Sequence, residues 1–239
     1  MTDTADSSAP PLALITGASR GLGAALAVVL AARGWHVVAV ARTTGALEEL
    51  DDRIQARGGS ATLAPLDITD DNALRHLCRS IHDRWGKVDL WAHTAVHAPP
   101  LSPAGHLAIK DWDRALAVTQ RATGVLIPMV EPLLRAARNG TALFFNDPAP
   151  RDADGTVRKF WGAWGAVKAG QIALAQAWAA ETSALGPGRA PRVVIVTPAP
   201  MPTASRARFF PGETHAKLAR PADEAARILA ALPGPMPGA

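Results

Sequence analysis

The chain has 239 residues, of which 48% are hydrophobic and 19% are charged, a composition typical of a globular protein and not of a disordered one. No apolar run reaches the roughly 20 residues that a membrane-spanning helix needs, so we expect no membrane association. The net charge is +4, but the arginines are scattered and form no basic stripe, which argues against nucleic-acid binding.

The chain is expected to begin with a flexible polar tail, residues 1–10, and to end with a flexible Pro/Gly tail, residues 233–239. Between them, residues 11–232 are expected to form one domain, because no composition shift marks a boundary. The N-terminal tail lacks the basic start and apolar stretch of a secretion signal. Together with the single cysteine, Cys78, this favours a cytoplasmic protein.

Within the domain, short apolar runs alternate with longer helical patterns, which is the signature of a parallel sheet wrapped by helices. Strands are expected at residues 12–16, 36–41, 61–66, 88–92, 141–145 and 192–196. Helices are expected at residues 21–33, 44–57, 70–85, 111–127, 161–183 and 222–231. Pro128 and Pro132 are expected to kink or end the fourth helix, and residues 198–221 to form a loop. The pattern predicts a Rossmann-like α/β fold, a doubly wound parallel sheet of six to seven strands.

Three glycines, Gly17, Gly21 and Gly23, join the first expected strand to the first helix. Glycine lets the backbone turn tightly and approach a pyrophosphate, and the helix N-terminus offers free N–H groups and a positive dipole end. Because the motif follows a strand and opens a helix, it predicts a dinucleotide site.

The residues after the second strand favour NADP over NAD. An NAD site would place a carboxylate there to hold the ribose 2′-hydroxyl, and the chain has Arg42 instead. Arg42 and Arg20 can pair with a 2′-phosphate. The alternative is that Arg42 simply ends a strand in solvent.

The chain resembles the short-chain dehydrogenase/reductase family over residues 12–231. The motifs that carry the resemblance are Thr16-Gly17-Ala18-Ser19-Arg20-Gly21-Leu22-Gly23, Leu66-Asp67-Ile68-Thr69-Asp70, Asp111-Trp112-Asp113-Arg114, Lys168, and Pro198 with Thr203. The resemblance implies that the cofactor contacts Gly17, Ser19, Arg20, Gly21, Leu22, Gly23, Arg42, Asp67, Ile68 and Lys168. In that family Asp67 would bind the adenine; alternatively, it caps the following helix.

The family's catalytic positions carry other residues in this chain. Its asparagine falls on Thr119, its serine on Asp147 and its tyrosine on Trp164, while its lysine is kept as Lys168; the chain contains no tyrosine at all. An indole N–H is a donor that does not ionise usefully, and an ionised Asp147 would repel a developing oxyanion. Losing a general acid costs on the order of 10²–10⁴-fold in rate. We also expect Asp147 and Lys168 to form an ion pair.

Two glycine positions of the family carry Val96 and Ala199, so features of the nicotinamide half are replaced while those of the adenine half remain. The first hypothesis is therefore a pseudoenzyme, a structural or regulatory subunit that retains or has lost NADP. The alternative is an active NADP-dependent oxidoreductase with His93, His97 or Asp147 as a non-standard proton donor. A third hypothesis is a nucleotide sensor. The histidines show no metal-ligand spacing, and no metal site is expected.

Small residues recur at four-residue spacing in the fifth helix: Gly165, Ala169, Ala173 and Ala177. Such a seam permits close approach of another helix. The resemblance implies a homo- or hetero-oligomer through the helices 111–127 and 161–183, with an active paralogue of the family as a candidate partner. The alternative is packing against the chain's own sheet.

Overall fold

The computed structural model describes residues 9–186, 188 and 190–232. Its centre is a parallel sheet of six strands in the order β3-β2-β1-β4-β5-β6. The strands are β1 (Leu12–Thr16), β2 (His36–Ala41), β3 (Ser60–Pro65), β4 (Leu90–His93), β5 (Thr141–Phe145) and β6 (Arg192–Val196). The predicted tails, residues 1–10 and 233–239, lie outside the described residues except for Ala9 and Pro10.

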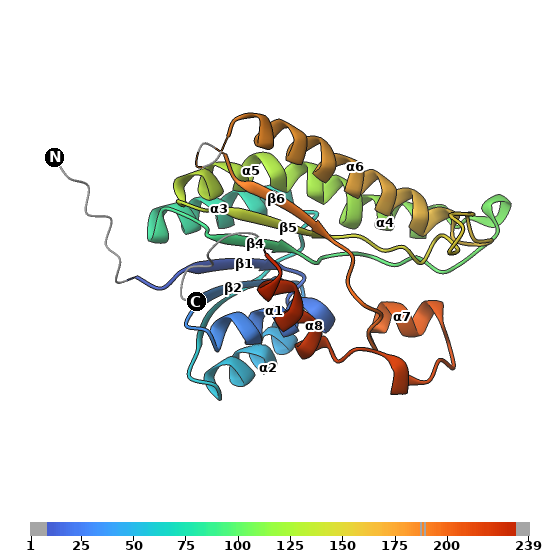
Figure 1. The fold of residues 1–239 in the computed structure, drawn as a ribbon, viewed down its shortest axis with the longest axis horizontal. Helices are drawn as coiled ribbons and strands as arrows, with labels where there is room; N and C mark the ends of the chain where they lie inside the picture. Colours follow the sequence, from blue (N-terminus) through green and yellow to red (C-terminus); the bar gives the residue numbers. More distant parts are fainter. Residues whose placement is uncertain (1–8, 187, 189, 233–239) are drawn as a thin grey trace.

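Helices cover both faces of the sheet (Figure 1). They are α1 (Gly21–Ala31), α2 (Thr44–Gln55), α3 (Asp71–Trp85), α4 (Ile109–Ala115), α5 (Ala122–Ala136), α6 (Gly162–Ala184), α7 (Ala204–Phe209) and α8 (Pro221–Ala230). The helices α3, α4, α5 and α6 lie on one face, and α1, α2 and α8 on the other. The predicted doubly wound α/β fold is confirmed.

Strand β1 is buried on both sides, as a central parallel strand should be. Leu12 and Leu14 belong to the core beneath α3 and α5, whereas Ala13 and Ile15 belong to the core beneath α1 and α2. All five residues of the strand are inaccessible to solvent. This continuous apolar run explains why the sequence located β1 correctly.

The helix expected at residues 111–127 is longer and more complex than predicted. It comprises α4, a π-helical segment (Leu116–Arg121) and α5, which passes through both Pro128 and Pro132. The expectation that these prolines end the helix is wrong. The apolar face of α5, which includes Leu126, Val130 and Leu133, is buried against the sheet, and such packing stabilises a helix more than local propensity does.

The segment expected as a loop, residues 198–221, contains α7 and a 3₁₀ turn (His215–Lys217). Thr203 begins α7 because its side-chain oxygen accepts the Arg206 N–H at 3.2 Å. Figure 1 shows α7 beyond the edge of the helical layers. Within the described part of the chain, no helix is both long and apolar enough to cross a membrane.

Candidate functional site

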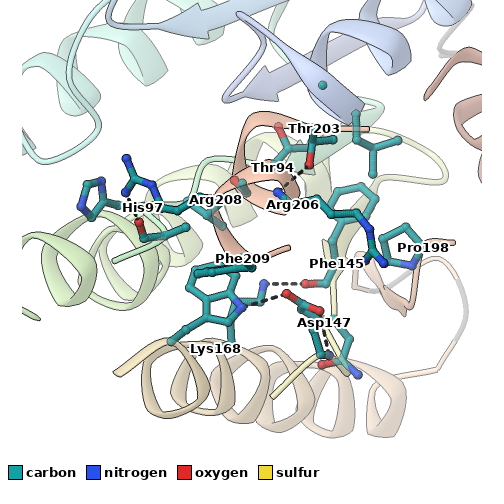
Figure 2. Close-up of a pocket in the computed structure, with 18 of the residues that line it drawn as sticks. Thr94, His97, Phe145, Asp147, Lys168, Pro198, Thr203, Arg206, Arg208 and Phe209 are labelled. Carbon is teal, nitrogen blue, oxygen red and sulfur yellow. Dashed lines mark hydrogen bonds between the residues drawn. The ribbon is translucent and has the colours of Figure 1, made fainter. Parts of the chain in front are cut away.

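A cavity of about 1400 Å³ opens where the carboxyl ends of the strands meet, beside the point at which strand order reverses between β1 and β4. Ligands of open α/β sheets bind at such switch points. The cavity is lined by the loop after β1, the ends of β2, β4 and β5, the start of α6, and α7 (Figure 2).

The glycine loop lies against the segment that follows β4. Gly17 has φ +86°, and a Cβ there would lie 2.6 Å from the Ala95 nitrogen. Gly21 also has a positive φ of +56°. Arg20 precedes α1 without a side-chain cap, so the first N–H groups of this helix remain available to an anion at the cavity. Ser19, Arg20, Gly21, Leu22 and Gly23, which the resemblance assigns to the cofactor, line the cavity.

Arg42 and Asp67 lie together at one end of the cavity. The Arg42 guanidinium is 3.9 Å from Asp67, which also accepts a 2.9 Å hydrogen bond from Arg114. Partial burial raises the pKa of Asp67, but the hydrogen bonds from Thr69 and Arg114 outweigh it and hold the pKa below its usual value. Asp67 therefore remains ionised at this end of the cavity.

The alternative role for Asp67, capping the next helix, is taken by Asp70. The Asp70 carboxylate accepts the N–H groups of Asn72 and Ala73 at 2.9 and 3.0 Å. Asp67 instead closes a tight turn with Thr69. Buried Ile68 lines the cavity between these groups.

The expected ion pair between Asp147 and Lys168 is wrong. The Trp164 indole donates to Asp147 at 2.8 Å, and the other oxygen of Asp147 accepts the Ala149 N–H at 2.9 Å. Lys168 Nζ instead donates to the Phe145 carbonyl and to Gln171 Oε1, both at 2.6 Å. Gln171, three residues along α6, accepts a hydrogen bond from the ammonium, while the indole donates to the carboxylate. Figure 2 shows Lys168 bonded to Phe145, with Asp147 nearby.

Burial governs the charge of Lys168. Its side chain is only 4% exposed, and burial lowers its pKa to about 8, an effect that the nearby Asp147 carboxylate partly opposes. The ammonium is therefore the predominant form at neutral pH, although it lies close to its titration range.

The two histidines proposed as substitute proton donors lie in different environments. His93 is fully buried, and its ring nitrogens bond Thr16 Oγ1 at 2.7 Å and Thr123 Oγ1 at 2.9 Å. Burial, with a contribution from Lys168, lowers its pKa to about 3, so it is neutral at pH 7 and bonded inside the core. His97 lines the cavity, and Thr119 serves to fix it by accepting the His97 backbone N–H at 3.1 Å.

An aromatic cluster closes the other end of the cavity, and sequence reasoning missed it. The ring of Phe209, on α7, lies 4.7 Å from that of Trp161 and 5.6 Å from that of Trp164. Phe210 also contacts Trp161, at 5.6 Å. Some 45 residues separate the two halves of the cluster, and no local pattern links them. Among the described residues, no group of His, Cys, Asp and Glu could hold a metal ion.

Residues 11–214 match the family model described as short chain dehydrogenase, so the chain belongs to that family. The uncharacterized oxidoreductase YciK of Escherichia coli is 28% identical over 214 residues, which cover 88% of this chain and 81% of that protein. A crystal structure of a short chain dehydrogenase from Shigella flexneri, complexed with NADP, is 27% identical with a TM-score of 0.79. The match covers 89% of this chain and 87% of the Shigella chain.

Other relatives match over shorter stretches. A fatty acyl-CoA reductase of Acinetobacter baylyi is 44% identical over 84 residues, which are 35% of this chain and 28% of that protein. The chain spans about half the length of an uncharacterized oxidoreductase of Listeria innocua.

Proposed function

We propose that this protein is an NADP-binding member of the short-chain dehydrogenase family that does not reduce carbonyl groups by the family's usual route. The observation that carries the proposal is the hydrogen bond between Trp164 and Asp147 beside Lys168. It occupies the place where the family resemblance puts a phenol and a serine hydroxyl.

The cavity fits a dinucleotide in size and chemistry. At about 1400 Å³ it exceeds the 300–1,000 Å³ typical of small-molecule sites. The uncapped start of α1 would receive the pyrophosphate, Asp67 the adenine, and Arg20 with Arg42 a 2′-phosphate. When bound, NADP supplies or accepts a hydride. The Shigella relative that contains NADP supports this assignment.

The residues beside Lys168 do not provide the proton that must accompany a hydride. The Trp164 indole is a donor already committed to Asp147. The Asp147 carboxylate accepts two hydrogen bonds and would oppose negative charge developing on a carbonyl oxygen. This pair can therefore hold a ligand but has no efficient means of passing a proton to it.

The alternative is an active oxidoreductase that uses His97, and the exposure of this residue to the cavity favours it. Burial and the neighbouring Arg208 and Arg114 lower the pKa of His97, so its neutral form predominates at pH 7. A neutral imidazole still donates one N–H. His93 is less suited, because it is buried and bonded at both nitrogens.

We further propose that the protein works as an oligomeric subunit in the cytoplasm, with a second copy or an active relative packed on α6. Ala169, Ala173 and Ala177 of the predicted seam are exposed on α6. Gly165 differs, because a Cβ there would lie 3.3 Å from Pro150 of the same chain. Three of the four seam residues thus support an interface, and the α4–α5 region adjoins α6.

Calorimetric titration with NADPH and NADH, followed by an NADPH-oxidation assay with aldehydes and ketones, tests the proposal. We expect NADPH to bind more tightly than NADH, and Arg42→Ala to weaken NADPH binding without changing NADH binding. We expect background turnover for the native protein. An Asp147→Ser, Trp164→Tyr double variant should gain roughly 10²-fold or more, the contribution of one general acid.

Robust turnover by the native chain would overturn the proposal, and its loss in His97→Ala would establish the alternative. A failure to bind either nucleotide would remove the cofactor assignment and leave only the role as a subunit.

A further inference from the structure

The wall of the cavity carries a surplus of positive charge. Seven arginine and lysine side chains and three aspartates line it, a surplus of four, which equals the formal net charge of the entire chain. A net surplus of one sign of charge in a cavity raises the local concentration of ligands of the opposite sign.

Most of these cations have an assignment. Arg20 and Arg42 belong to the nucleotide end described above. Arg158 pairs with Asp152 at 2.7 Å, and Lys168 is buried against neutral oxygens. The charges of these four residues are therefore assigned to the nucleotide, to an ion pair or to a buried site, and are not available to a second ligand.

Three arginines remain: Arg151, Arg206 and Arg208. Arg206 forms a two-pronged ion pair with Glu213 at 2.6 Å. Arg151 and Arg208 are both exposed, and each donates one hydrogen bond to a backbone carbonyl, but the acceptor of Arg151 is Gly155 in its own loop. This leaves Arg208 as the cation that reaches from α7 across to another segment of the cavity wall.

Arg208 is held in place but not neutralised. Its guanidinium donates one hydrogen bond, of 2.6 Å, to the carbonyl oxygen of Ala98 in the segment after β4. Within the described chain no carboxylate forms an ion pair with it. Figure 2 shows Arg208 beside His97 on one side of the cavity, and the positive charge of Arg208 contributes to the lowered pKa of His97 after the larger effect of burial.

An apolar wall adjoins this free cation. Phe209 follows Arg208 in α7 and packs on Trp161 and Trp164. The guanidinium and the exposed edges of these largely buried rings therefore both line the cavity. A guanidinium matches carboxylate and phosphate groups through parallel hydrogen bonds.

We propose that this end of the cavity binds an amphiphilic anion, with its apolar body against Trp161, Trp164 and Phe209 and its carboxylate or phosphate on Arg208. This names the ligand class for the half of the cavity that the nucleotide leaves open. This inference rests on the proposed function in one respect, the assignment of the rest of the cavity to NADP.

The test uses calorimetry on the full chain, with and without NADP, and four probes with one aromatic body: phenylacetate, benzyl phosphate, phenylacetamide and phenethylamine. We expect either anion to bind roughly tenfold or more tightly than the neutral amide, as expected for hydrogen bonds to a charged group. The amine should bind most weakly. Comparison of phenylacetate with benzyl phosphate identifies which anionic group the site prefers.

Three variants separate charge recognition from a structural role. Arg208→Met should abolish the preference for phenylacetate over phenylacetamide while leaving amide affinity unchanged. Arg208→Lys should keep most of the preference. Arg79→Met, which removes an exposed arginine of α3 outside the cavity, should change nothing.

Equal affinity of the native protein for phenylacetate and phenylacetamide would overturn the inference. Equal weakening of both probes in Arg208→Met would also overturn it, because Arg208 would then only hold α7 to Ala98. If the native protein prefers the anions but does not bind NADPH, only the proposed function is contradicted. If it binds NADPH but shows no preference for the anions, only this inference is contradicted.

Discussion

His93 shows how burial determines the chemistry of a single residue. It ends β4 and lies against Trp91 and Phe144, with ring centroids 5.3 and 5.9 Å away. Threonine hydroxyls bond both of its nitrogens, so the neutral ring is satisfied where it lies. A protonated ring would carry an unpaired charge in the core.

This burial predicts an acid-sensitive contribution to stability. The folded-state pKa of His93, about 3, lies below its ordinary value of 6.5, so below pH 6.5 the unfolded state binds a proton that the folded state does not. The free energy of unfolding should therefore fall by about 2 kcal/mol between pH 7 and pH 5 on account of this residue. Urea titrations at both values should show a smaller fall in His93→Asn.

The matched control is His106→Asn, which changes an exposed histidine and should leave the pH dependence of unfolding as it is. An equal fall in His93→Asn and in the native protein would show that His93 is not the buried neutral group described here.

At the scale of elements, the turn between β1 and α1 depends on glycine for two separate reasons. Gly17 adopts a positive φ, and a Cβ would meet the backbone of Ala95 at 2.6 Å. Gly34, which ends the turn after α1, has a similar φ of +82°, but a Cβ added there would have no neighbouring atom within 4 Å. Substitutions at these two positions therefore distinguish the cost of backbone strain, present at both, from the cost of a steric clash, present only at Gly17.

Gly34→Ala should lower the free energy of unfolding by about 1–2 kcal/mol, the cost of a side chain in the left-handed region. Gly17→Ala should cost about 1–3 kcal/mol more, because the segment after β4 must also move. Denaturant titrations of both variants measure the difference. Equal losses would mean that Ala95 yields freely and that the close approach does not restrict Gly17.

At the scale of the molecule, the exposed alanine face of α6 predicts association. Ala173 lies in the middle of this face, between Ala169 and Ala177. A charged side chain there would be buried against a partner helix without a counter-ion. We expect Ala173→Arg to convert a dimer or larger assembly into a monomer, as measured by light scattering after size-exclusion chromatography.

Ser80→Arg, on the exposed side of α3, is the control and should leave the mass of the assembly unchanged. A native protein that is monomeric at micromolar concentrations would contradict self-association. The subunit role would then require a different chain as partner.

Local pattern determined most of the fold. The bounds of β1, β2 and β5 follow from apolar runs that are buried on both faces, and the start of α1 at Gly21 follows from the glycine motif. The sequence also brings the glycine loop, Arg42 and Asp67 together at one cavity, because each of them follows the carboxyl end of a parallel strand. The predicted helix ends at residue 127, before the end of α5, because local sequence indicates the cost of Pro128 and Pro132 but not the packing that offsets it.

Only the tertiary structure decided the partners of side chains that are distant in the sequence. Trp164 rather than Lys168 bonds Asp147, because Gln171 and the Phe145 carbonyl hold the ammonium in the core. Likewise, Arg208 reaches Ala98 across 110 positions of the chain. Sequence spacing fixes which residues share a strand end or a helix face, whereas competition among hydrogen-bond partners depends on distances and burial that arise once the elements pack.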